Sequence, residues 1–177
     1  MVVLLNGAPG VGKSTLAGLV VRQRPMMLAL DLDGIKHALG GWDDDAGAAG
    51  RHARRLAVAL MREHLAAGYD VAVAQYLART EFIEDLERVS ANSGAQFVEV
   101  VLVVDVPTLS QRLRERQAHP GRPEHAINNS LVGPADAPRL AATIDDIQKL
   151  RPRSTRVDAS GSLAETLVLI LAVLDQR

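Results

Sequence analysis

The stretch Asn6-Gly7-Ala8-Pro9-Gly10-Val11-Gly12-Lys13-Ser14-Thr15 decides the fold, because Gly7 to Ser14 fit the pattern G-x-x-x-x-G-K-[ST]. The apolar run Val2–Leu5 comes directly before it, and a helical pattern runs from Ser14 to Val21. Strand, glycine-rich turn and helix form the context in which this pattern binds phosphate. The alternative is a glycine-rich turn without a ligand, and the complete motif in its complete context disfavours it.

The residue types of this loop suit the phosphates of a nucleotide. Its glycines let the backbone wrap closely, so that consecutive N–H groups point at phosphate oxygens, and the helix N-terminus adds partial positive charge. Lys13 is expected to reach the β- and γ-phosphates, and the Ser14 hydroxyl to hold Mg²⁺. The residues predicted to contact the nucleotide here are Gly7, Ala8, Pro9, Gly10, Val11, Gly12, Lys13, Ser14 and Thr15.

Length and composition restrict the class of protein. A chain of 177 residues suits one domain, residues 1–177, and is short for two. The net charge of −1 and the aromatic content of 3% disfavour nucleic acid and membranes as partners. The absence of cysteine excludes disulfides and thiol chemistry. No signal-peptide pattern opens the chain, and the longest apolar run, Leu167–Leu174, is far below the about 20 residues of a membrane span, so we expect a cytoplasmic protein.

Strand-like apolar runs alternate with helical patterns along the whole chain. This alternation predicts an α/β fold of three layers, a P-loop fold with a five-stranded parallel sheet and right-handed crossovers. Gly68 and Gly94 are expected to end two of the helices, and Ser162 with Glu165 forms a capping box that opens the last one. The expected strands are Val2–Leu5, Met26–Leu32, Asp70–Tyr76, Phe97–Val104 and Arg153–Asp158.

Ligands of such sheets lie at the carboxyl ends of the strands, where two aspartates follow the second strand. Asp31 and Asp33 are two residues apart, so strand alternation predicts that they share one side. A carboxylate there can accept the proton of an attacking hydroxyl, or hold Mg²⁺ through water. The alternative is a structural cap of the following helix, for which Asp33 is well placed.

Arginines follow the fourth strand. Arg112 and Arg116 are four residues apart in a predicted helix and therefore share a face. A segment rich in proline and glycine, with Arg122, comes next. We expect a short lid at about residues 117–126 that brings guanidinium groups onto the transferred phosphoryl group. The alternative is an ordinary solvated face of the helix.

The third strand ends in Gln75, where many P-loop proteins have an acid that organises Mg²⁺. The metal is therefore expected to depend on Ser14, water and Asp31. Gln75 and Arg79 are candidate contacts of the substrate. The last helix is apolar on nearly all sides, which predicts burial against the sheet or, as an alternative, a homodimer interface.

Three segments carry a resemblance to a known group: GAPGVGKST at Gly7–Thr15, DLDGI at Asp31–Ile35 and RLRER at Arg112–Arg116. They resemble small P-loop phosphotransferases of the nucleoside-monophosphate-kinase-like superfamily, such as chloramphenicol phosphotransferase and related bacterial kinases. The resemblance implies that Asp33 activates the acceptor hydroxyl. It further implies that Arg112 stacks on adenine, that Arg116 contacts phosphates, and that the loop with Ser160 and Gly161 touches the adenine.

The resulting hypothesis is a kinase that uses ATP and Mg²⁺ to phosphorylate a hydroxyl of a small molecule such as an antibiotic, a nucleoside or a sugar. Its catalytic residues would be Asp33, Lys13 and Arg116, and its substrate contacts Asp31, Asp33, Gln75, Arg79 and Arg122. Two alternatives stay open: a polynucleotide 5′-hydroxyl kinase, and a nucleotide-dependent binding protein that sequesters its ligand without transfer. A GTPase is disfavoured because no N-K-x-D motif precedes the last strand.

Overall fold

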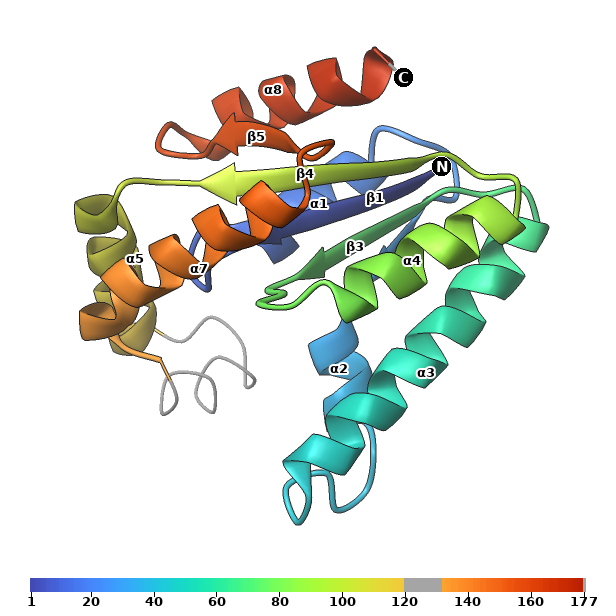
Figure 1. The fold of residues 1–177 in the computed structure, drawn as a ribbon, viewed down its shortest axis with the longest axis horizontal. Helices are drawn as coiled ribbons and strands as arrows, with labels where there is room; N and C mark the ends of the chain where they lie inside the picture. Colours follow the sequence, from blue (N-terminus) through green and yellow to red (C-terminus); the bar gives the residue numbers. More distant parts are fainter. Residues whose placement is uncertain (120–131, 177) are drawn as a thin grey trace.

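The computed structural model describes residues 1–119 and 132–176, and a five-stranded parallel sheet forms its centre (Figure 1). The order of the strands is β2-β3-β1-β4-β5, so the strand that leads into the phosphate-binding loop (residues 7–15) lies in the middle. The predicted α/β fold with five parallel strands is confirmed. The strands are β1 (Val2–Gly7), β2 (Leu28–Leu30), β3 (Val71–Gln75), β4 (Phe97–Val103) and β5 (Thr155–Asp158).

Helices cover both faces of this sheet, which gives three layers (Figure 1). α1 and α8 pack on one face, while α3, α4 and α7 lie on the other. The helices are α1 (Lys13–Val21), α2 (Leu32–His37), α3 (Ala46–Ala66), α4 (Glu81–Asn92), α5 (Val106–Ala118), α7 (Ala137–Leu150) and α8 (Leu163–Asp175), with a 3₁₀ turn η1 (Pro134–Asp136) before α7.

The side chains of β1 divide the core into two halves. Val3 and Leu5 are buried with residues of α1 and α8, whereas Val2 and Leu4 are buried with residues of α3 and α4. All four are fully buried, as expected for a central parallel strand that helices cover on both sides. This packing holds the end of β1, and with it the start of the phosphate-binding loop, in a fixed place.

The second strand is shorter than the sequence predicts, and the expected alternation of Asp31 and Asp33 along a strand is wrong. Pairing of β2 ends at Leu30, and α2 begins at Leu32. Asp31 is the N-cap of α2, where its Oδ1 accepts hydrogen bonds from the N–H groups of Asp33 (3.1 Å) and Gly34 (3.2 Å). Two unpaired N–H groups at a helix start favour a capping aspartate, so Asp31 and not Asp33 takes the structural position.

The last helix, α8, packs against the core of the sheet as predicted, but only one of its apolar sides is buried. Its capping box is present, since Ser162 Oγ accepts from the Glu165 N–H and Glu165 accepts from the Ser162 N–H. However, Val168 is 65% exposed and Leu169 47% exposed, because a helix on the outside of a three-layer fold buries a single stripe. That stripe is Thr166, Ile170 and Leu174.

The predicted lid lies only partly within the described residues. The predicted lid at 117–126 overlaps the end of α5 at residues 117 and 118, and Arg122 lies outside the described residues. Thr80 precedes α4 and makes no side-chain capping bond. None of the helices in the described part of the chain combines the length and apolar character that a membrane crossing requires.

Candidate nucleotide-binding site

The phosphate-binding loop has the backbone that its glycines predict. Gly10 and Gly12 have φ angles of 90° and 99°, a left-handed conformation that side chains with a Cβ rarely adopt. Gly7 is required for a second reason, since a Cβ there would lie 2.7 Å from the carbonyl oxygen of Leu102 in β4. The loop therefore lies close against the sheet and leads directly into α1 at Lys13.

A pocket of about 280 Å³ opens beside this loop, between the start of α1, α5 and the start of α8. Arg112 Nη2 donates to the carbonyl oxygens of Ser160 and Gly161, at 3.4 Å each, so it spans one side of the pocket. The structure thus places Arg112 beside the loop after β5. The lining residues are Gly10, Val11, Gly12, Thr15, Leu16, Arg112, Ala159, Gly161, Leu163 and Thr166.

Lys13 lies on the phosphate-binding loop, and charged side chains from two other helices act on it. Lys13 is half-buried at the start of α1, and its Nζ donates to the Ala8 carbonyl at 2.9 Å. The pKa of Lys13 is lowered to about 7, first by burial and then by the positive charge of Arg116 in α5, while the negative charge of Asp33 in α2 opposes both. Asp33 and Arg116 are thus close enough to act on the Lys13 charge, although the chain separates them by more than eighty residues.

The loop that follows β3 is tied to the phosphate-binding loop through a residue that the sequence analysis missed. Asn6 is completely buried at the end of β1 and hydrogen-bonds to the backbone of Gly7 and Leu77. Gln75 pairs in register with Asn6 and is half-buried, while Arg79 is exposed two residues beyond Leu77. The sequence did carry a signal for this contact, because Asn6 directly follows the apolar run Val2–Leu5. An amide in a buried strand needs hydrogen-bond partners.

The donor set fits Mg²⁺, a cation that prefers oxygen ligands and keeps several waters. Ser14 is exposed in the first turn of α1, and the carboxylates of Asp31 and Asp33 follow β2. Within residues 1–119 and 132–176, no group of three or more acidic or histidine side chains forms a preassembled metal site. A metal that arrives with the nucleotide and takes part of its ligands from phosphate suits this arrangement.

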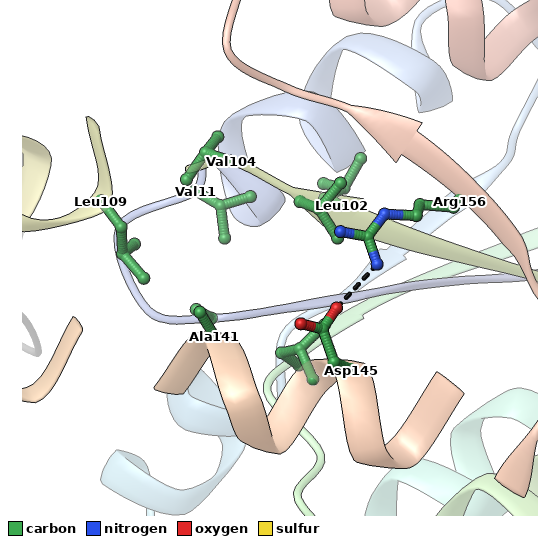
Figure 2. A pocket seen from close by; sticks show the side chains of 10 residues that line it. Val11, Leu102, Val104, Leu109, Ala141, Asp145 and Arg156 are labelled. Carbon is green, nitrogen blue, oxygen red and sulfur yellow. Dashed lines mark hydrogen bonds and ion pairs between the residues drawn. The ribbon is translucent and has the colours of Figure 1, made fainter. Parts of the chain in front are cut away.

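A second, smaller cavity of about 40 Å³ lies behind the phosphate-binding loop (Figure 2). Val11, Leu102, Val104 and Leu109 line it together with Ala141, and an ion pair between Arg156 and Asp145 (2.7 Å) lies at its edge. The guanidinium is engaged by this carboxylate and by Gln148 (3.0 Å). The glycine-rich backbone and Arg112 belong instead to the larger pocket, which is therefore the candidate nucleotide site.

Solved structures share the fold over nearly the whole chain. A gluconokinase from Sinorhizobium meliloti 1021 is 18% identical, with a TM-score of 0.65 over 98% of this chain and 91% of that one. The Deinococcus radiodurans tunicamycin resistance protein is 14% identical, with a TM-score of 0.66 over 98% and 95% of the two chains. The Pnkp1/Rnl/Hen1 RNA repair complex is 16% identical, with a TM-score of 0.68 over 84% of this chain and 45% of that one.

These TM-scores establish the fold, and the predicted resemblance to P-loop kinases is confirmed at that level. A search of curated proteins found no match. The model of the family AAA_33, described as an AAA domain, matches residues 2–131, which include the phosphate-binding loop and α5. The chain therefore belongs to the AAA_33 family of AAA domains.

Proposed function

We propose that this protein is an ATP-dependent kinase that transfers the γ-phosphoryl group to a hydroxyl of a small molecule. The observation that carries the proposal is the position of Lys13 on the phosphate-binding loop, with Arg116 and Asp33 close enough to act on its charge. One acid beside two cations, next to a cradle of backbone N–H groups, is what phosphoryl transfer needs: a proton acceptor and preorganised positive charge.

ATP is proposed to lie with its phosphates on the loop and its base in the pocket beside Arg112. The N–H groups of the loop and of the first turn of α1 would face the phosphate oxygens. The Arg112 guanidinium, held by two carbonyl oxygens of the loop after β5, offers a flat face on which a purine can stack. Ser160 and Gly161 would then border the base.

In the transfer step, the acceptor oxygen forms a bond to the γ-phosphorus while the bond from that phosphorus to the β,γ-bridging oxygen breaks. The hydroxyl proton passes to the Asp33 carboxylate, and the bridging oxygen leaves with ADP. Lys13 and Arg116 stabilise the negative charge that develops on the phosphoryl oxygens and on ADP. This assignment uses Asp33 and not Asp31, because Asp31 is engaged as the cap of α2.

Magnesium would be held by the Ser14 hydroxyl and, through water, by Asp31. When bound, Mg²⁺ neutralises charge on the β- and γ-phosphates and favours in-line transfer. The orientation of the nucleotide would still come from the loop and from Arg112.

The acceptor is proposed to lie beyond Asp33, next to the loop after β3. Gln75 and Arg79 border this side, and Arg122, which lies outside the described residues, stays a predicted contact. One structural neighbour is named for tunicamycin resistance and another for gluconate, which supports antibiotics and sugar-like hydroxyl compounds as the first acceptors to test.

The test is a mass-spectrometric screen of the protein with ATP, Mg²⁺ and a panel of hydroxyl-bearing antibiotics, nucleosides and sugars. The expected result is one acceptor class that gains the mass of a phosphate. Lys13→Ala and Asp33→Asn should abolish this gain, and Asp33→Asn should still bind ATP. Asp146→Asn is the matched control, because Asp146 is exposed on α7 and pairs with Lys149 of the same helix (2.8 Å).

Two results would contradict the proposal. Tight binding of ATP and of a panel compound, with no phosphorylated product, would favour a sequestering protein. Labelling of a 5′-hydroxyl oligonucleotide in place of any small molecule would favour a polynucleotide kinase. The net charge of −1 argues against the latter, since binding to a polyanion depends on basic contacts.

A further inference from the structure

Asn6 has a polar side chain and is completely buried. It follows the apolar residues of β1 and precedes Gly7, the first residue of the phosphate-binding loop. Burying an amide without hydrogen bonds is costly, so the bonds it makes indicate what it is there to hold.

The side-chain amide of Asn6 makes three hydrogen bonds, two through its oxygen and one through its nitrogen. Oδ1 accepts from the N–H of Gly7 (2.8 Å) and from the N–H of Leu77 (3.0 Å), and Nδ2 donates to the Leu77 carbonyl (3.3 Å). Both backbone groups of Leu77 thus pair with one side chain. The amide of Asn6 acts as a substitute peptide group beside β3.

The position of Leu77 explains why such a substitute is useful. Backbone pairing of β1 with β3 ends at Asn6 and Gln75, and Leu77 lies two residues further along the chain. The side-chain amide extends the pairing by one step, past the point where Gly7 turns away into the phosphate-binding loop. Leu77 is itself buried, so the tie is shielded from water, and shielded hydrogen bonds hold geometry well.

The tie joins the two halves of the proposed active site. On one side is the loop that would cradle the phosphates, and on the other is the segment with Gln75 and Arg79, the candidate contacts of the acceptor. We propose that Asn6 is a positioning residue that fixes the loop after β3 against the phosphate-binding loop and thereby sets the acceptor relative to the γ-phosphate. The kinetic part of this inference rests on the proposed kinase function, whereas the coupling between the two loops does not.

The coupling is tested without any acceptor, by amide hydrogen exchange in the protein titrated with Mg²⁺ and the ATP analogue AMP-PNP. In the wild-type protein, the Leu77 amide should exchange at least 10 times more slowly than the amide of Ala78, an exposed residue, and the NMR signal of the Leu77 amide should shift as AMP-PNP saturates. In Asn6→Ala and Asn6→Val, AMP-PNP should bind within about threefold of its wild-type affinity, but the protection of Leu77 should be lost. Asn6→Val removes the amide without leaving a void, so the two variants separate hydrogen bonding from packing.

Ser90→Ala is the matched control. Ser90 is also completely buried, and its hydroxyl donates to the Ala95 carbonyl (2.8 Å) at the far end of α4. The Ser90→Ala variant should have a lower melting temperature, because it loses a buried hydrogen bond. Its Leu77 amide should stay protected from exchange.

The kinetic test uses the acceptor that the mass-spectrometric screen identifies. Both Asn6 variants should lower kcat at least 10-fold while KM for ATP stays within about threefold, and Ser90→Ala should change neither. A kcat within twofold of wild type in a folded Asn6 variant would overturn the positioning role. Free exchange of the Leu77 amide in the wild-type protein would overturn the tie itself, even if neither variant folds. If no acceptor is phosphorylated while Leu77 behaves as expected, the kinase proposal fails and the coupling stands.

Discussion

Affinity for nucleotide is expected to fall as the pH rises above 7, because Lys13 must be protonated to pair with phosphates. In the nucleotide-free protein the pKa of Lys13 is lowered to about 7, first by burial and then by the charge of Arg116, with Asp33 acting in the opposite direction. Bound phosphates add negative charge next to the ammonium group and raise its pKa again. Nucleotide binding therefore takes up a proton.

The magnitude follows from that pKa. With a value of about 7, Lys13 is about half protonated at pH 7 and about one-hundredth protonated at pH 9, so the apparent Kd rises by up to about 50-fold between them. Lys13 has the opposite effect on the folding stability of the nucleotide-free protein. Because the unfolded chain keeps its lysine protonated up to about 10.5, stability from this group increases as the pH rises from 7 to 10.5.

The assay is titration calorimetry with Mg²⁺ and ADP, which gives Kd at pH 7, 8 and 9, and proton uptake at pH 8 in two buffers of different ionisation enthalpy. The expected uptake is about 0.9 proton per nucleotide bound. Lys13→Arg is the control, because a guanidinium stays protonated throughout this range and should give a flat dependence on pH. A wild-type Kd that is constant from pH 7 to 9, or proton release on binding, would refute the reasoning.

Three substitutions should each change the stability of the protein through one local feature. Gly7→Ala should destabilise the protein by about 1–3 kcal/mol in urea unfolding, because its Cβ would meet the Leu102 carbonyl oxygen at 2.7 Å; an unchanged midpoint would contradict the close approach. Met26→Gly should stabilise by about 0.5 kcal/mol, since Met26 has a φ of 56°, and thermal unfolding would show no gain if that strain is absent. Ser162→Ala should cost about 1 kcal/mol through loss of the α8 capping box, measured by the same melts, whereas Ser160→Ala, outside the box, should cost less.

Local patterns predicted the parts of the molecule that depend on local physics. The order of strands and helices follows from hydrophobic periodicity, and Ser162 with Glu165 forms the predicted capping box because its partners are three residues apart. The glycine-rich loop was found for the same reason: Gly10 and Gly12 need conformations that few other residues adopt.

Contacts between distant segments were harder to predict. Asn6 and Leu77 are 71 residues apart, and nothing near either residue shows that a buried amide will join them. Asp31 and Asp33 were both reasonable caps, and the choice was made by the point at which β2 ends, which depends on pairing with β3. Lys13, Arg116 and Asp33 were each selected from their own segments, but only the fold shows that the other two charges lie close enough to act on the lysine.

The helix α5 carries both Arg112, beside the pocket, and Arg116, beside Lys13. The helix therefore fixes the spacing of the two arginines, because four residues correspond to about 6 Å along its axis. Under the proposed function, this spacing sets the guanidinium group at the base relative to the one at the phosphates. Inserting one residue between the two arginines would turn the second by about 100° away from the loop. Length variation among related chains should accordingly fall after Arg116 and spare the turn that separates the two guanidinium groups.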